Sequence, residues 1–296
     1  MAKLEKLAKS YRVDHGHHFR LKDFDPDDHG SLRSEEHASE ALEKGIEQLR
    51  ELQDKLYAQD RWALLLIFQG MDAGGKDSAI KHVMSGVNPQ GCQVYSFKQP
   101  SVEELNHDYL WRCQRHLPQR GRIGIFNRSY YEEVLVVRVH PEALENERIP
   151  PSLAGKEIWE QRFDDICTWE RYLAHNGVVI RKFFLNLSKK EQAKRFLARL
   201  DEPEKNWKFS ASDIHERKYW HDYRQAYQEA IRHTSTPEAP WYVVPADHKW
   251  FTRLVVASAI VDTLEELRLG YPRVDAARRK ELEQARKLLK SEKARG

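Results

Sequence analysis

The 296-residue chain lacks three features that would assign it to common classes of protein. Its apolar runs, such as Ala63–Phe68, are far shorter than the about twenty residues that cross a bilayer. The beginning of the sequence contains no apolar segment of the kind that directs secretion. Its three cysteines are too few and too widely spaced for a disulfide framework or a cysteine-based zinc site. We therefore expect a cytoplasmic protein that does not interact with membranes.

The chain also has little net charge. Its 49 basic and 46 acidic residues leave a formal charge of +3, so a uniformly basic nucleic-acid-binding protein is not expected. A hydrophobic fraction of 40% is enough to bury a core, which argues against global disorder. The basic segment 273–296 is interpreted as a solvated helix and not as a nucleic-acid-binding arm, because glutamates and leucines are interspersed among its Arg and Lys residues.

Short apolar segments alternate with helical patterns over most of the chain. After an extended N-terminal arm, leucine and isoleucine recur at helical spacing over residues 34–58. Five segments rich in Val, Ile, Leu and Phe are predicted to be buried parallel strands: residues 61–69, 92–97, 122–126, 178–185 and 241–245. This alternation predicts a three-layer α/β sandwich with a five-stranded parallel sheet. We expect an arm and helix at 1–60, one domain at 61–272 and a charged tail at 273–296.

The segment that follows the strand at 61–69 carries the most informative motif. It reads G-M-D-A-G-G-K-D over Gly70–Asp77 and leads into a helical pattern. Gly70, Gly75 and Lys76 match the G-x-x-x-x-G-K frame of a phosphate-binding loop. In such a loop, glycines let backbone N–H groups surround a phosphate, while the helix N-terminus and the lysine add positive charge. The strand–loop–helix context predicts a P-loop kinase-like fold.

Two carboxylates lie in this loop, Asp72 and Asp77. These carboxylates would repel a polyphosphate unless a cation lay between the carboxylates and the phosphates. We therefore expect Mg²⁺ held by Asp72 and Asp77. For Asp77 a second interpretation is open. It stands where Ser or Thr usually ends the motif, and an acidic residue there also stabilises the N-terminus of a helix.

A second polar segment follows the predicted strand at 122–126. Asn127, Arg128 and Glu132 would emerge at the edge of the sheet where open α/β folds bind ligands. Asn127 occupies the position where a P-loop protein usually has a metal-contacting aspartate, so any metal contact there must use the amide oxygen or a water. Asn127 or Arg128 alone could be an ordinary residue at the surface. The combination of Asn127, Arg128 and Glu132 beside the phosphate-binding strand favours a ligand-binding site.

Residues 195–224 form a basic helical segment that is broken near Pro203. P-loop kinases carry a lid at this point of the chain, which closes over phosphates and supplies cations. A charged, solvated hairpin is the alternative. The aromatic residues of the segment have a spacing that favours packing between lid helices over stacking on a base: Trp207, Phe209, Trp220, Tyr223 and Tyr227.

Together these segments resemble the family-2 polyphosphate kinases over about residues 10–272. The resemblance is carried by Gly70–Asp77, Ser96–Pro100, His107–Arg112 (H-D-Y-L-W-R), Phe126–Glu133 (F-N-R-S-Y-Y-E-E), Arg199–Phe209 and Ala239–Ala246 (A-P-W-Y-V-V-P-A). It implies phosphoryl transfer, in either direction, between inorganic polyphosphate and AMP, ADP or ATP, with guanine nucleotides as further candidates. It also implies Mg²⁺ as cofactor and a homodimer or homotetramer.

The resemblance also implies roles for residues. Asp72 would bind magnesium and orient the acceptor phosphate, Lys76 would contact phosphate, and Arg128 with the lid cations would hold polyphosphate. Many relatives have Asp where Asn127 stands and Asn where Glu132 stands. The Asn/Glu combination resembles the subgroup that accepts both AMP and ADP.

We therefore expect three catalytic residues, Asp72, Lys76 and Arg128. Contacts with phosphate or polyphosphate are expected from Gly70, Gly74, Gly75, Lys81, Arg195, Arg199, Lys205 and Lys208. Nucleotide contacts are expected from Arg112, Asn127 and Glu132, and metal contacts from Asp72 and Asp77.

Two other classes of function are compatible with the same motifs. The fold also permits an ATP-dependent nucleoside or nucleotide kinase. A regulatory P-loop module that binds nucleotide without turnover, or a nucleic-acid-binding protein, is the third possibility. The excess of cations over what one triphosphate needs favours polyphosphate as the donor.

Overall fold

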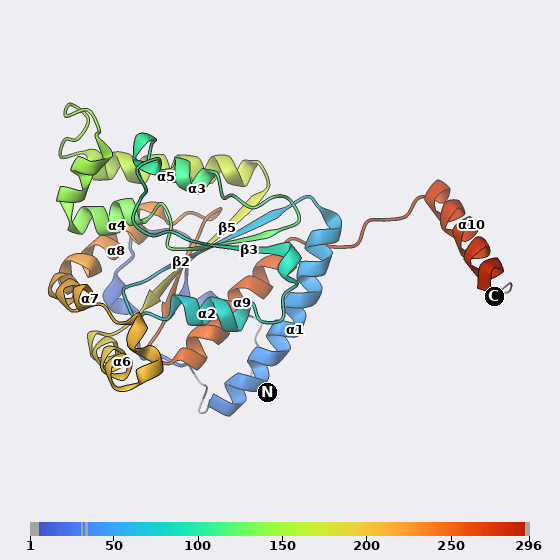
Figure 1. Cartoon of the computed structure of the whole chain (residues 1–296), viewed down its shortest axis with the longest axis horizontal. Helices are drawn as coiled ribbons and strands as arrows, with labels where there is room; N and C mark the ends of the chain where they lie inside the picture. The colour runs from blue at the N-terminus through green and yellow to red at the C-terminus, as the bar shows by residue number, and fades with distance from the viewer. Residues whose placement is uncertain (1–5, 31, 33–34, 294–296) are drawn as a thin grey trace.

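The computed structural model describes residues 6–30, 32 and 35–293, and its centre is a six-stranded sheet (Figure 1). The strands are β1 (Arg12–Val13), β2 (Ala63–Gln69), β3 (Cys92–Ser96), β4 (Ile123–Asn127), β5 (Val178–Asn186) and β6 (Trp241–Pro245). Their order is β1-β6-β5-β2-β4-β3. The five strands from β2 to β6 run parallel, which confirms the predicted parallel sheet.

The sheet has one strand more than we predicted. Arg12 pairs with Tyr242 and Val13 with Trp241, so β1 adds an antiparallel edge beside β6. We expected an extended arm here because two residues are too few to form a recognisable alternating pattern. The arm therefore completes the sheet, and it covers the edge that β6 would otherwise expose.

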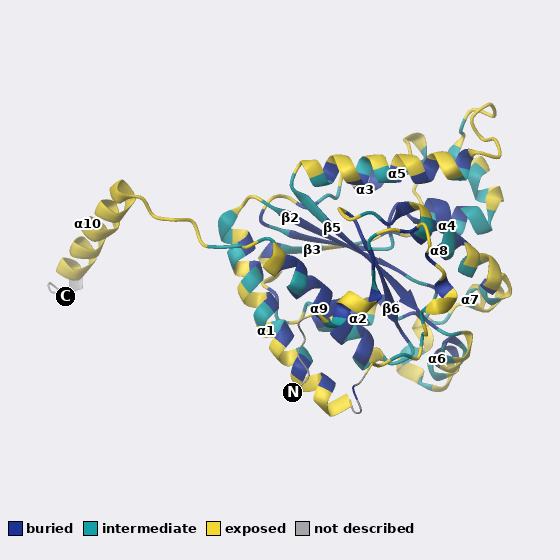
Figure 2. Ribbon diagram, turned by 180° about the vertical axis from the view of Figure 1, so that it is seen from behind, coloured by how far each residue is buried: buried dark blue, intermediate teal, exposed yellow. Residues whose placement is uncertain are grey.

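Helices cover both faces of the sheet, as the alternation of strands and helices predicted. α1 (Glu35–Gln59), α2 (Lys76–Val83) and α9 (Lys249–Glu266) lie on one face. α4 (Glu132–Val139), α5 (Ile158–His175) and α8 (Trp220–Thr234) lie on the other, with the short α3 (Trp111–Gln114) beside them. Leu64 and Leu66 of β2 pack in the first layer, and Leu65 and Ile67 pack in the second. Successive side chains of a strand point to opposite faces, so β2 is buried throughout, as Figure 2 shows for the central strands.

The predicted lid is a helical hairpin that follows β5. α6 (Lys189–Asp201) begins at Ser188, whose hydroxyl accepts a hydrogen bond from the backbone N–H of Glu191 at 3.1 Å. The chain then forms a 3₁₀ turn (Pro203–Lys208), α7 (Ala211–Glu216) and a second short turn that leads into α8. Proline cannot continue the α6 hydrogen-bond ladder, so the hairpin turns near Pro203 as the sequence indicated.

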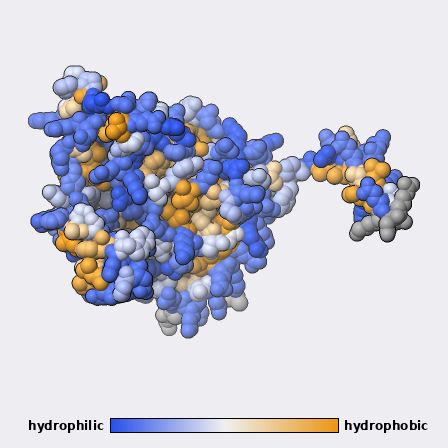
Figure 3. Space-filling view, viewed as in Figure 1, coloured by the Kyte–Doolittle hydropathy of each residue, from blue (hydrophilic) through white to orange (hydrophobic). Residues whose placement is uncertain are grey.

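The packing predicted for the lid aromatics is wrong for one of them. Trp220 and Tyr227 are buried, and Tyr223 and Phe209 are half-buried, but the Trp207 side chain is 78% exposed. Figure 3 shows hydrophobic surface over α6 and α7, to which Leu197, Leu200, Trp207 and Ile214 contribute. The helical spacing that predicted packing does not extend through the turn after Pro203, because a 3₁₀ turn directs its side chains differently.

The C-terminal segment forms α10 (Ala276–Lys293), which stands apart from the other helices at the end of an extended connection (Figures 1 and 2). Its described side chains are exposed, including Leu282, Leu288 and Leu289. The predicted solvated helix is confirmed. Among the described residues, no helix is long and apolar enough to span a membrane.

Candidate active site

A cavity of about 680 Å³ opens where β2 and β4 end, between the phosphate-binding loop and the lid. The loop contributes Gly70 and Asp72, and the segment after β4 contributes Arg128 and Glu132. Arg112 lines it from the α3 side. Parallel strands end at one edge of the sheet, where ligands bind in open α/β folds. The structure thus brings five of the predicted site residues together in one cavity.

The phosphate-binding loop has the tight backbone that its glycines predict. Gly75 has a φ of 96°, a left-handed conformation that favours glycine. A side chain at Gly74 would place its Cβ 2.7 Å from the Met71 carbonyl oxygen. Ala73, which directly precedes Gly74, has a φ of 60° and is therefore a strained non-glycine residue. The loop therefore holds a conformation that few other sequences could adopt.

Lys76, the first residue of α2, points back into the loop. Its Nζ donates a hydrogen bond to the Gly70 carbonyl oxygen at 2.6 Å, and the residue is buried. Burial lowers the pKa of Lys76, and the nearby positive charge of Arg128 lowers it further, against the opposing effect of Asp72. A phosphate in the loop would add negative charge beside this ammonium group and would favour its protonated form.

Arg128 and Asp72 form an ion pair across the cavity floor. The Arg128 Nη2 lies 3.1 Å from an Asp72 carboxylate oxygen, and its Nη1 lies 3.6 Å from the Glu132 carboxylate. Burial opposes the charge of Arg128, but Glu132 and Asp72 outweigh it and raise the pKa of Arg128. Gln69 donates a hydrogen bond from Nε2 to the other Glu132 oxygen at 3.1 Å. Arg128 is thus a permanent cation, and Glu132 is held in a fixed orientation at its side.

Asp77 and Asn127, the last residue of β4, form a second polar pair beside the loop. Asn127 donates a hydrogen bond from Nδ2 to an Asp77 carboxylate oxygen at 2.5 Å, and Asp77 is otherwise exposed. Among the described residues, no cluster of three or more His, Cys, Asp or Glu side chains could enclose a metal ion. Magnesium usually binds one or two carboxylates together with substrate phosphates and water. The carboxylates of Asp72 and Asp77 fit that kind of site.

A second recess lies on the other side of the phosphate-binding loop. It is small, about 10 Å³, and is lined by Gly74, Gly75, Ser78, Ala79, Ala246, Lys249, Thr252 and Arg253. Arg253 donates a hydrogen bond to the Ser78 hydroxyl at 3.1 Å, and its buried Nε has no hydrogen-bond acceptor among the described residues. Burial lowers the pKa of Lys249, and the neighbouring positive charges of Arg195, Lys205 and Arg253 lower it further. We call Lys249, Arg253 and Lys205 the cation cluster.

Lys249 and Arg253 were not predicted from the sequence. Lys249 is the first residue of α9, and Arg253 lies four residues later. One signal could have indicated them, because a helix that follows a parallel strand begins at the same sheet edge as the phosphate-binding loop. Two basic residues four apart at such a helix start lie on one face.

Arg195 lies behind the phosphate-binding loop, with all of its guanidinium nitrogens bonded to protein acceptors. It donates to the carbonyl oxygens of Ala73 at 3.0 Å and Ala246 at 2.5 Å, and its Nε lies 3.0 Å from the Glu191 carboxylate. The side chain is buried. These contacts support the loop from beneath. The contact with polyphosphate that we predicted for Arg195 stays a prediction.

The other predicted cations lie outside the large cavity. Arg199 pairs with Asp213 of α7 at 3.4 Å, Lys205 pairs with Glu202, and Lys208 lies over the Trp207 ring. Lys81 is exposed on α2 and lines neither recess. Arg217 is the lid cation that lines the cavity. Closure of the lid would have to move Arg199 and Lys208 toward the loop for them to contact a phosphate.

Arg112 is almost fully buried at the cavity wall. Its Nη2 donates to the Lys98 carbonyl oxygen at 2.8 Å, its Nη1 lies 3.8 Å from the Glu104 carboxylate, and its guanidinium lies over the Phe97 ring. Glu133, next to Glu132, also lines the cavity and is paired with Arg162 at 3.8 Å. Burial and the nearby Glu147 carboxylate raise the pKa of Glu133 to about 8.

Comparison with known proteins finds close similarity over nearly the whole chain. The model of the family described as Polyphosphate kinase 2 (PPK2) matches residues 32–269. The ADP-polyphosphate phosphotransferase of Rhodopseudomonas palustris is 54% identical, over 95% of this chain and 98% of its own length. The AMP/ADP-polyphosphate phosphotransferase of Meiothermus ruber is 45% identical, over 92% of this chain and 98% of its own.

A solved structure agrees with the sequence comparison. The crystal structure of Polyphosphate Kinase 2 from Arthrobacter aurescens TC1 superposes with a TM-score of 0.86 at 39% sequence identity. The superposition covers 95% of this chain and 98% of that one. The fold described above, with its phosphate-binding loop and lid, is therefore that of a P-loop kinase-like protein.

Proposed function

The chain belongs to the polyphosphate kinase 2 family, and on that premise we propose that it transfers phosphoryl groups between inorganic polyphosphate and the nucleotides AMP and ADP. Relatives similar over almost their full lengths are an ADP-polyphosphate and an AMP/ADP-polyphosphate phosphotransferase. The observation that carries the proposal is the position of Lys76. From the start of α2 its side chain points into a loop that has a nucleotide-sized cavity on one side and a cluster of cations on the other.

The acceptor nucleotide is proposed to occupy the large cavity. A volume of about 680 Å³ lies within the range of small-molecule sites. Arg128 supplies a permanent cation for the acceptor phosphate. Glu132 is fixed beside it by Gln69 and by Arg128 itself, so its carboxylate can determine how long a phosphate chain fits there. This supports the prediction that the chain accepts both AMP and ADP.

The donor is proposed to approach from the other side of the loop. Lys249, Arg253 and Lys205 bring positive charges together, and Lys249 lies at the N-terminus of α9. Like charges at short range repel one another unless an anion lies between them. A chain that carries about one negative charge per phosphate would satisfy all of them at once, whereas a single phosphate would not. We therefore place the polyphosphate chain along the cation cluster, with its last phosphate in the loop.

In the proposed reaction, the phosphate-binding loop holds the terminal phosphoryl group of polyphosphate between donor and acceptor. An oxygen of the nucleotide's last phosphate attacks that phosphorus, and the bridging P–O bond breaks. The electron pair of that bond stays on the oxygen of the shortened polyphosphate. Lys76 exchanges the Gly70 carbonyl for the transferring phosphoryl, and Arg128 stabilises its charge from the acceptor side. The same contacts serve the reverse transfer.

Kinases of this kind use a divalent metal to neutralise phosphate charge. We propose that Mg²⁺ fills this role and that Asp72 holds it, with Asp77 as the second carboxylate. Asn127 would then orient Asp77 through their hydrogen bond. Asp72 would then interact both with the metal and with Arg128, its ion-pair partner at 3.1 Å.

The function is tested by measuring turnover with different donors. Purified protein, Mg²⁺ and AMP or ADP are incubated with polyphosphate, and nucleotide products are separated by chromatography. We expect ADP and ATP to form with polyphosphate, and little product to form from AMP when ATP replaces polyphosphate as donor. Faster transfer from ATP would favour a conventional nucleotide kinase. Tight nucleotide binding without any turnover would favour a regulatory module.

Two finer predictions accompany the proposal. GMP and GDP are expected as further acceptors, and the same chromatographic assay measures them. The family resemblance also predicts a homodimer or homotetramer. Light scattering on the purified chain, coupled to size-exclusion chromatography, gives the assembly directly, and a monomer at micromolar concentration would contradict this prediction.

A further inference from the structure

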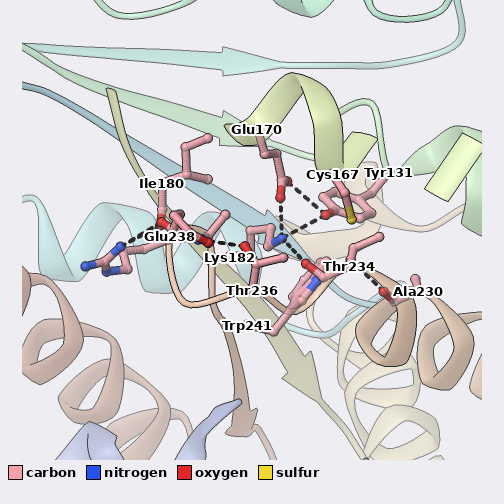
Figure 4. A network of polar contacts seen from close by, with 12 residues as sticks. Tyr131, Cys167, Glu170, Ile180, Lys182, Ala230, Thr234, Thr236, Glu238 and Trp241 are labelled. Carbon is pink, nitrogen blue, oxygen red and sulfur yellow. Dashed lines mark hydrogen bonds and ion pairs between the residues drawn. The ribbon is translucent and has the colours of Figure 1, made fainter. Parts of the chain in front are cut away.

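We propose that a buried ion pair, Lys182–Glu170, is a positioning device for Arg128 and Glu132. The inference rests on the proposed function, because it concerns the residues that would contact the acceptor. The network is seen from close by in Figure 4. Lys182 and Glu170 line neither recess, so they act through other residues and do not touch substrate.

The network satisfies every donor of a fully buried ammonium group. Lys182 Nζ donates to Glu170 Oε2 at 2.6 Å, to the Tyr131 hydroxyl at 3.0 Å and to the Thr234 carbonyl oxygen at 2.8 Å. The other oxygen of Glu170 accepts hydrogen bonds from the hydroxyls of Tyr130, at 2.7 Å, and Tyr131, at 2.9 Å. Lys182 and Glu170 are 0% and 1% exposed. Two consecutive tyrosines are therefore tied to one carboxylate oxygen.

Such a pair is an expensive way to stabilise a core. Removing both charges from water is unfavourable, and a protein in which apolar side chains of similar size replace a buried ion pair is often as stable or more stable. Burial indeed lowers the pKa of Lys182, and Glu170 opposes that shift. The ion pair fixes the orientation of the two tyrosine side chains, because its hydrogen bonds determine where their hydroxyls lie. Apolar side chains would not supply this orientation.

The tyrosines lie between the two residues of the site. Arg128 is followed by Ser129, Tyr130 and Tyr131, and then by Glu132 at the start of α4. Arg128 has a φ of 64°, a left-handed conformation that is strained for a residue with a long side chain. Strained residues persist only where the surrounding structure over-determines them. Here the end of β4 fixes one side of Arg128, and the two anchored tyrosines fix the other.

The same network also reaches a second wall of the cavity. Thr234, which accepts from Lys182, is the last residue of α8, and its hydroxyl accepts from the Trp241 indole at 2.9 Å. Tyr223 and Tyr227 of α8 line the cavity. Lys182 therefore connects β5 and α5 to the segment that carries Arg128 and to the helix opposite it. A shift of the ammonium group would move both walls relative to the phosphate-binding loop.

The first test removes one polar group of the network at a time. Tyr131→Phe deletes only one hydroxyl, and Lys182→Met replaces the ammonium group with an apolar chain of similar length. We expect kcat with AMP to fall about tenfold or more, since small displacements of reacting groups are costly, while KM for polyphosphate stays within about twofold because the donor binds on the other side of the loop. We also expect the ratio of AMP to ADP turnover to change, because Glu132 directly follows Tyr131.

A matched control lies next to Lys182 on the same strand. Arg181 is also buried, but its side chain points to the other face of the sheet, where it bonds Thr263 at 2.9 Å and Glu266 at 3.4 Å. Arg181→Met should lower the melting temperature without lowering kcat. If Arg181→Met and Lys182→Met reduce kcat equally, or if Tyr131→Phe turns over like the wild type, the positioning role is refuted.

A second variant separates positioning from stability. Combining Lys182→Met and Glu170→Met with Tyr130→Phe and Tyr131→Phe removes the ammonium group, the carboxylate and the two tyrosine hydroxyls together, which should recover much of the melting temperature lost in Lys182→Met. Low kcat in this stable variant supports positioning, and recovery of kcat along with stability contradicts it. A wild-type protein without polyphosphate turnover would instead refute the proposed function, so the two failures are distinguishable.

Discussion

The Arg128 guanidinium lies 3.1 Å from the Asp72 carboxylate, although the two residues are in different loops of the sheet edge. Asp72 lies in the phosphate-binding loop after β2, and Arg128 directly follows β4. Because β2 and β4 are adjacent parallel strands, their carboxyl ends bring the two side chains together. This pair marks the point between donor and acceptor at which we expect transfer, and five predictions follow from its surroundings.

Lys76→Ala should lower kcat by about 10²–10³-fold, the usual loss when one preorganised donor to a developing charge is removed. The fold should survive, because within the described part of the chain the ammonium group donates a hydrogen bond only to the Gly70 carbonyl oxygen. Steady-state kinetics and circular dichroism check both points. Lys44→Ala, on the exposed side of α1, is a control for loss of one positive charge, and a Lys76→Ala protein with a near-normal rate would contradict the loop assignment.

Asp72→Asn should raise the Mg²⁺ concentration needed for half-maximal activity and lower kcat by roughly 10²-fold, because it removes a metal carboxylate and the partner of Arg128. A Mg²⁺ titration of kcat measures this. Asp77→Asn decides between the two interpretations of that residue. A shifted Mg²⁺ requirement identifies a metal ligand, whereas an unchanged requirement with a loss of about 0.3–1 kcal/mol in unfolding free energy identifies a helix N-terminal residue.

Glu132→Asn should reduce kcat/KM for AMP by roughly tenfold more than for ADP. Its carboxylate is fixed by Gln69 and Arg128 beside the expected position of the acceptor phosphate, and a factor of ten corresponds to ~1.4 kcal/mol of transition-state binding. The comparison uses both acceptors at one polyphosphate concentration. Equal losses with AMP and ADP would mean that Glu132 does not select the acceptor.

Lys249→Ala and Arg253→Ala should raise KM for polyphosphate by roughly tenfold, ~1.4 kcal/mol each, and leave KM for AMP nearly unchanged. Binding of a polyanion through several cations weakens steeply with salt, so each variant should also flatten the dependence of polyphosphate KM on salt. Arg199→Ala and Lys208→Ala, the lid cations predicted from sequence, are measured in parallel. If Arg199→Ala and Lys208→Ala raise KM for polyphosphate more than Lys249→Ala and Arg253→Ala do, polyphosphate binds along the lid and not along the cation cluster.

The buried Glu133 predicts a pH dependence of stability. Burial and the nearby Glu147 raise the pKa of Glu133 to about 8 in the folded protein, well above its ordinary value in an unfolded chain. The folded state therefore binds a proton that the unfolded state releases. The resulting stabilisation is complete below the ordinary glutamate pKa and is lost as pH rises toward 8. The melting temperature of the wild type relative to Glu133→Gln should fall between pH 5 and pH 8 and level off above, and a constant difference would contradict the shift.

Several features could be predicted from sequence because they depend on neighbouring residues. The phosphate-binding loop requires glycines and a lysine at fixed spacing, and Gly74 and Gly75 do adopt the tight conformation that the motif implies. The parallel strands were recognisable from short apolar runs. Asn127, Arg128 and Glu132 were placed at the sheet edge because they directly follow one of these strands. In each case, local chemistry and chain order were sufficient.

Other features were decided by contacts between distant segments. The two-residue strand β1 pairs with β6, more than two hundred positions later, and has too few residues to form a pattern of its own. Arg195 belongs by sequence to a basic lid helix, yet it bonds the carbonyl oxygens behind the phosphate-binding loop. A helix shows which residues share a face, but only packing determines what that face meets.

The sequence by itself determined the chemistry of this protein, because a phosphate-binding loop is a short continuous segment whose function follows from its backbone. Only the tertiary structure decided which charges surround that loop. Lys249 and Arg253 of α9 lie beside the loop, and Lys182 donates hydrogen bonds to Glu170 and Tyr131 inside the core. A lysine within an apolar strand indicates a buried partner without identifying it. The partner is fixed by the order and register of β5 among the other elements, since a buried ammonium group is stable only where acceptors from several segments converge.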